Sequence, residues 1–97
     1  MGLFAVFRTR GAAWKQGVPL EGQEDWAGHA AFMDGLYAEG FALLVGPLEG
    51  SSDALIIIRA NSPEDIEDRL LADPWSELGL LVTSRISPWT LRLGSVG

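Results

Sequence analysis

The chain contains a single histidine, His29, and its neighbours predict an unusual setting for a titratable group. The segment DWAGHAAFMDGL, residues 25–36, has the residue spacing of a helix. At about 100° per residue, His29 falls within an apolar stripe made by Trp26, Ala30, Met33, Leu36 and Tyr37. An imidazole turned toward a core is either a structural residue bonded to a backbone carbonyl or an acid–base group in a pocket.

Asp73 is the second residue whose position in the sequence is unusual for its side chain. It ends the second predicted helix, where the helix dipole disfavours a carboxylate, and Pro74 forces it out of the helical region. One interpretation is that Asp73 caps a short turn over residues 74–78. The other is that it orients His29 and stabilises the protonated ring, as carboxylates do in acid–base catalysis. The two are compatible, because one carboxylate oxygen can cap the turn while the other faces a pocket.

Four further residues are candidates for substrate binding. Arg8, in the first predicted strand, could hold a substrate carboxylate or phenolate, or it could pair with acids at the surface. Trp14, Trp75 and Trp89 could line an aromatic pocket, or they could pack in the core. The chain has no cysteine and one histidine, which excludes thiolate and multi-histidine metal sites. We therefore expect neither a metal nor a cofactor.

Four strands are predicted by β-prone apolar runs bounded by turn residues, at residues 3–9, 41–50, 54–60 and 78–93. Gly46 and Pro47 interrupt the second strand, which indicates a bulge or a sheet edge. Pro88 interrupts or bends the fourth strand. The first, third and fourth strands are apolar at nearly every position, so both faces of the sheet need to be buried.

Two helices are predicted between these strands. The first opens with the acidic residues Glu24 and Asp25 and stops at Gly40. The second has Ser62 as its N-cap and Pro63 in its first position. Residues 10–22 contain three glycines and a proline and predict a long loop, a feature that is often functional in a compact domain.

The resulting order, βαββαβ, is that of a ferredoxin-like α+β fold with a four-stranded antiparallel sheet. Both helices then cover the same face of the sheet, which allows His29 and Asp73 to approach each other. One chain lacks the material to cover the opposite apolar face. We therefore expect a homodimer that packs sheet against sheet.

Length and charge limit the classes of protein that remain. A chain of 97 residues predicts a single domain over residues 1–97. Thirteen acidic and seven basic residues give a net charge of −6, which argues against nucleic-acid binding. The N-terminal apolar run has five residues, too few for a signal peptide or a membrane span. We expect a cytoplasmic protein that binds neither nucleic acid nor membranes.

The pattern H…FM…L…G…LVGPL, then ADPW and ISPW, resembles the YciI-like (YCII-related) family over residues 29–89. The resemblance implies a dimeric α+β barrel similar to muconolactone isomerase. It also implies a His–Asp dyad in a pocket, at His29 and Asp73. One branch of that family removes chloride from a chlorinated hydroxyhydroquinone. This chain departs from the shorter members in its first loop, where Trp14 and Lys15 intrude.

Two hypotheses about function follow. In the first, the protein is a cofactor-independent enzyme that transfers protons or eliminates a leaving group on a small cyclic or aromatic acid. In the second, it is a non-catalytic dimeric module of the same fold that binds small molecules or other proteins. The setting of His29 and Asp73 separates them, because an enzyme needs the pair to open onto a cavity and a structural pair would be sealed.

Overall fold

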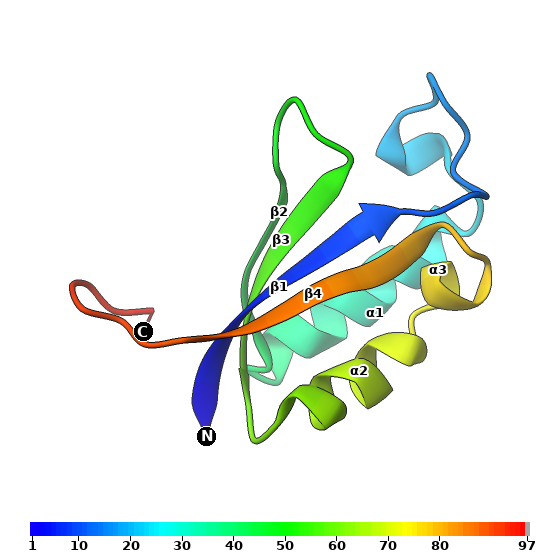
Figure 1. The fold of residues 1–97 in the computed structure, drawn as a ribbon. Helices are drawn as coiled ribbons and strands as arrows, with labels where there is room; N and C mark the ends of the chain where they lie inside the picture. Colours follow the sequence, from blue (N-terminus) through cyan, green and yellow to red (C-terminus); the bar gives the residue numbers. More distant parts are fainter. Residues whose placement is uncertain (97) are drawn as a thin grey trace.

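The protein is described by a computed structural model, which covers residues 1–96 and has a four-stranded antiparallel sheet at its centre (Figure 1). The strands are β1 (Gly2–Arg10), β2 (Ala42–Pro47), β3 (Asp53–Ala60) and β4 (Leu81–Trp89). The helices are α1 (Trp26–Ala38), α2 (Pro63–Leu71) and the short α3 (Pro74–Glu77), with a 3₁₀ turn at Leu20–Gly22. The sheet order β2-β3-β1-β4 confirms the predicted ferredoxin-like α+β fold.

The helices cover one face of the sheet and leave the other bare (Figure 1). Residues of β1 alternate accordingly: Phe4, Val6 and Arg8 are buried, while the residues between them are only half-buried. The main core joins the buried side of β1 and β3 to α1 and α2, through residues that include Val6, Leu36, Ile56, Ile58, Ile66 and Leu70. Arg8 therefore lies on the helix-covered face of the sheet, in line with core residues.

The second helix begins as predicted. The Ser62 hydroxyl accepts a hydrogen bond from the Asp65 amide at 3.2 Å, and Pro63 occupies the first turn. The first helix begins differently, because Asp25 is the N-cap and not part of the first turn. Its φ of 51° is left-handed and its side chain accepts from the Gly28 amide at 3.1 Å. The helix ends as predicted before Gly40, which has a φ of 80°.

Two predicted interruptions of the strands are corrected. The register irregularity of β2 lies between Ala42 and Leu44, and not at Gly46 and Pro47, although β2 is an edge strand as expected. Pro88 does not interrupt β4; it lies opposite Phe4, and the strand continues to Trp89. An edge strand tolerates a proline because its outward amide needs no partner in the sheet.

The predicted loop is an ordered segment. Arg10 still belongs to β1, and a 3₁₀ turn lies within the segment. The buried Gln23 side chain binds the backbone of Lys15 twice, at 3.0 and 2.9 Å, and the carbonyl of Val18 at 2.9 Å.

The predicted apolar stripe of α1 is corrected at Tyr37, because this residue is exposed and lies outside the buried side of the helix. Among residues 1–96, no helix is long and apolar enough to cross a membrane.

Candidate active site

The structure brings His29 and Asp73 into contact, as the sequence predicted that it could. The Nδ1 atom of His29 lies 3.0 and 2.9 Å from the two carboxylate oxygens of Asp73. His29 comes from α1, and Asp73 precedes Pro74 at the junction of α2 and α3. Asp73 Oδ1 also accepts from the Trp75 amide at 3.0 Å, which makes Asp73 the N-cap of α3. Asp73 therefore both caps the turn and binds His29.

Arg8 is a third member of this cluster. Its Nη1 donates to Asp73 Oδ2 at 2.6 Å, and its Nη2 donates to the Ser76 hydroxyl at 2.5 Å. Both charged side chains are buried, Arg8 with 1% and Asp73 with 0% of its surface exposed. The sequence alone predicts either a substrate anion or a surface acid as the partner of Arg8. In the structure Arg8 pairs with the buried acid Asp73, and it is absent from the described lining of a cavity next to His29.

Asp73 is ionised in spite of its burial. Burial alone would raise the pKa of its carboxyl group. The hydrogen bonds from His29, from the Trp75 amide and from Arg8 outweigh that effect and hold the pKa below its ordinary value of 3.8. An ionised carboxylate can only accept hydrogen bonds, so Nδ1 of His29 carries a proton and donates a hydrogen bond to Asp73.

Two tryptophans lie against the imidazole, and a third packs on one of them. The Trp75 indole is stacked on the His29 ring, with 3.8 Å between centroids and 2° between planes. Trp75 is fixed in turn by its Nε1, which donates to the Glu24 carbonyl at 2.6 Å. Trp14 meets Trp75 edge to face at 5.4 Å, and Trp26 lies 5.9 Å from His29. The ring of His29 is therefore held on one side by an aromatic surface.

His29 also lines a cavity of about 430 Å³, and its side chain is 12% exposed. Most of the lining is apolar and includes Trp14, Leu20, Trp26, Met33, Val45 and Trp75. The described residues that line it include two acids, Asp34 and Asp53, and one cation, Arg10. The guanidinium of Arg10 lies 4.6 Å from the centre of the Trp14 ring. His29, which is bonded to Asp73, thus borders a space with aromatic walls.

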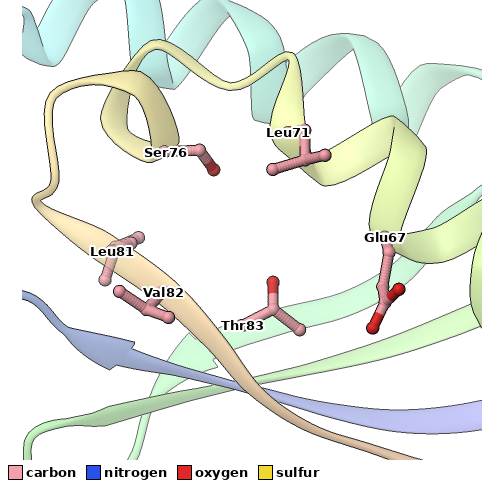
Figure 2. A pocket seen from close by; sticks show the side chains of 6 residues that line it. All are labelled: Glu67, Leu71, Ser76, Leu81, Val82 and Thr83. Atoms are coloured by element: carbon pink, nitrogen blue, oxygen red, sulfur yellow. The ribbon is translucent and has the colours of Figure 1, made fainter.

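A second hollow of about 290 Å³ lies between α2, α3 and the edge strand β4 (Figure 2). Its lining consists of Glu67, Leu71, Ser76, Leu81, Val82 and Thr83. The hydroxyl of Ser76 points into this hollow in Figure 2. The same hydroxyl accepts from Arg8, so the hydrogen-bonded cluster extends from the first cavity to the second.

Not every predicted site residue belongs to the site. Trp14 and Trp75 line the cavity with His29, but Trp89 lies opposite Leu3 at the other end of β4. The lining also contains residues that were not predicted as site residues, among them Trp26 and Arg10. A signal for Trp26 was present, because it lies three positions before His29 on the same helix face.

In the part of the chain that the structure describes, no three His, Cys, Asp or Glu side chains are grouped so that they could hold a metal ion.

No protein-family model and no curated protein sequence matches this chain. Among solved structures, it is similar to 5-chloro-2-hydroxyhydroquinone dehydrochlorinase from Burkholderia phenoliruptrix, in complex with 2,5-dihydroxybenzoquinone. The sequences are 21% identical, the match covers 91% of this chain and 93% of the other, and the TM-score is 0.68. At this level of identity the similarity establishes a shared fold.

Proposed function

We propose that this protein is a cofactor-independent acid–base enzyme that acts on a small cyclic or aromatic acid. The observation that carries the proposal is the position of His29, which is bonded to ionised Asp73 and also lines a cavity. A purely structural pair would have no need of such access. The dyad therefore favours an enzyme over a binding module of the same fold.

The proposed chemistry follows from the two nitrogens of the imidazole. Asp73 accepts a hydrogen bond from Nδ1–H, so the neutral ring has its lone pair on Nε2. Nε2 would remove a proton from a carbon or hydroxyl group next to a carbonyl of the substrate. The released electron pair forms a new double bond. In an elimination the leaving group departs with its bonding electrons, and in an isomerisation the proton returns at another carbon.

The lining of the cavity is the evidence for a ring-shaped substrate. Its aromatic walls, with Trp75 behind His29 and Trp26 beside it, offer flat surfaces to a planar ring. Arg10 is the cation available to a carboxylate or phenolate of the substrate. The structurally similar dehydrochlorinase binds 2,5-dihydroxybenzoquinone, a ring of this kind.

We also propose that the chain is a single-domain member of the YciI-like family and forms a homodimer. The order of its motifs supports the family, with His29 in the first helix and Asp73-Pro74 after the second. The face of the sheet without helices (Figure 1) supports the dimer, because it carries apolar residues such as Ala5, Leu44 and Ile57.

Turnover of candidate substrates tests the proposal. Chlorinated hydroxyhydroquinones, catechols and small lactones should be screened by chloride release and by ultraviolet absorbance. A positioned general base contributes about 10²–10⁴-fold, so His29→Ala should lower kcat/KM by that factor. Asp73→Asn should also lower it, whereas Asp68→Asn, at an exposed carboxylate, should leave it unchanged. Full activity in His29→Ala would exclude the proposed mechanism, and binding of 2,5-dihydroxybenzoquinone without turnover of any compound would favour a binding module.

A further inference from the structure

The carboxylate of Asp73 is held by more donors than a simple His–Asp dyad requires. Trp75 donates to Oδ1, Arg8 donates to Oδ2, and His29 Nδ1 lies about equally far from both oxygens. Two fixed donors, one on each oxygen, set the plane of the carboxylate. That plane then decides how the imidazole is oriented.

Arg8 is itself anchored at a second point. Its other terminal nitrogen donates to the Ser76 hydroxyl, and that hydroxyl donates to the Leu70 carbonyl at 2.7 Å. The guanidinium therefore spans the distance between Asp73 and Ser76 as a rigid fork. A lysine ammonium is a single point charge and cannot bind both groups with this geometry.

Charge gives Arg8 a second effect on the dyad. Arg8 and Asp73 are buried together and their charges cancel, so the cluster is neutral when His29 is neutral. Without the guanidinium, the buried carboxylate would have only His29 to supply a positive charge. The other charged groups around the cavity are Arg10, Asp34 and Asp53, and in the described structure none of them is bonded to His29.

We propose that Arg8 is a positioning residue that balances the charge of Asp73 and fixes its carboxylate, so that His29 keeps its proton on Nδ1 and its lone pair on Nε2. This inference rests on the proposed function, in which Nε2 acts as the base. Arg8 acts through Asp73, since it lies outside the described lining of the cavity. Within residues 1–96 Nε of Arg8 has no hydrogen-bond partner, and the two terminal nitrogens of the guanidinium bind Asp73 and Ser76.

The single histidine allows a direct test without a substrate. In protein labelled with ¹⁵N in its imidazole, the nitrogen shifts report which ring nitrogen carries the proton. The wild type should show the Nδ1–H tautomer and a protected Nδ1 proton at neutral pH. Arg8→Lys keeps the charge but not the fork, and should give a mixture of the two tautomers. Ser76→Ala should change the tautomers in the same direction, because it removes the anchor of the fork.

Two further variants complete the charge argument. Arg8→Met removes both the charge and the donor to Asp73 Oδ2, and it should lower the fraction of the Nδ1–H tautomer further than Arg8→Lys does. If Arg8→Met does not fold, the double variant Arg8→Met/Asp73→Asn removes both buried charges. The double variant should lose the protected Nδ1 proton of His29. Arg69→Lys is the control, because Arg69 also binds a carboxylate, with one terminal nitrogen donating to both oxygens of the exposed Glu39. Its histidine spectrum should equal that of the wild type.

Activity gives an independent readout. With any substrate found for the wild type, Arg8→Lys should lower kcat by about 10²-fold with KM little changed, since misplaced catalytic groups cost about that much. Wild-type tautomer populations in both Arg8→Lys and Ser76→Ala would overturn the positioning role and leave the proposed function intact. Full activity in His29→Ala would instead overturn the proposed function, whatever the spectra show.

Discussion

The carboxylate of Asp73 is shared by donors from three elements. Arg8 comes from β1, His29 from α1, and the Trp75 amide from α3. The site is therefore tied to the sheet and to both helical segments at one buried point. Removing one partner of a buried ion pair usually costs about 3–5 kcal/mol, because the remaining charge has no compensation. At neutral pH Asp73→Asn should be destabilised by a value of this order.

The lowered pKa of Asp73 predicts a pH-dependent part of the stability. Because the folded pKa lies below the ordinary value of 3.8, this carboxylate stabilises the fold fully above that value. The contribution is lost as the pH falls through the folded pKa. Urea unfolding between about pH 5 and pH 2 should therefore show a smaller loss of unfolding free energy in Asp73→Asn than in the wild type. Asp68→Asn should follow the wild type, and parallel curves for all three proteins would contradict the assignment.

At the scale of elements, the chain just after β1 makes a close backbone contact with the residues just before β4. This contact lies next to residues that line the cavity. The Gly11 amide donates to the Leu80 carbonyl at 2.8 Å, and a Cβ on Gly11 would overlap the Gly79 carbonyl oxygen. Gly11 follows Arg10 and precedes Trp14, which both line the cavity. The close backbone contact thus fixes where the ordered segment leaves the sheet.

Gly11→Ala should therefore be destabilised by about 1–3 kcal/mol, the usual cost of forcing atoms into a packed region. Gly35→Ala is the matched control. No atom lies within 4 Å of a Cβ built on Gly35, which is an interior position of α1. It should gain about 0.5–1 kcal/mol, because alanine favours a helix. Thermal and urea unfolding measure both changes, and equal stability of Gly11→Ala and wild type would show that the segment can move away.

The elements that the sequence predicted well are those with local signals. Ser62 and Asp73 cap helices within three residues of themselves, and a proline follows each of them. The start of α1 was placed too early because the left-handed conformation of Asp25 has no local signal in the sequence. The partner of Arg8 could not be predicted, because it lies 65 residues away in the chain. Residue spacing placed Arg8 among the apolar residues of β1 but said nothing about what it would meet.

The two faces of the whole molecule differ in their cover. The helices bury one face, and the other carries apolar side chains that include Leu3, Ala5, Phe7, Leu44, Leu55 and Ile57. The pairing of Leu44 with Ile57, and of Ile57 with Ala5, places these residues on the same side of the sheet. The sequence predicted this excess of apolar surface from strands that are hydrophobic at nearly every position. Alternation in β1 then shows which residues belong to which face.

A second copy of this chain would cover this face of the sheet. A homodimer that packs sheet against sheet should bury more than roughly 1,200 Å² in total, the lower bound for a specific interface. Leu44 is 58% exposed on the bare face, and Leu71 is 65% exposed on α2, on the other side of the sheet. Both are leucines of similar exposure, so Leu44→Lys and Leu71→Lys add the same charge to opposite sides. Sedimentation velocity at micromolar concentration should show a dimer for the wild type and for Leu71→Lys. Leu44→Lys should shift toward monomer, because a lysine ammonium is costly to bury without a partner. A monomeric wild type would exclude the dimer, and dissociation of Leu71→Lys alone would place the interface on the helical side.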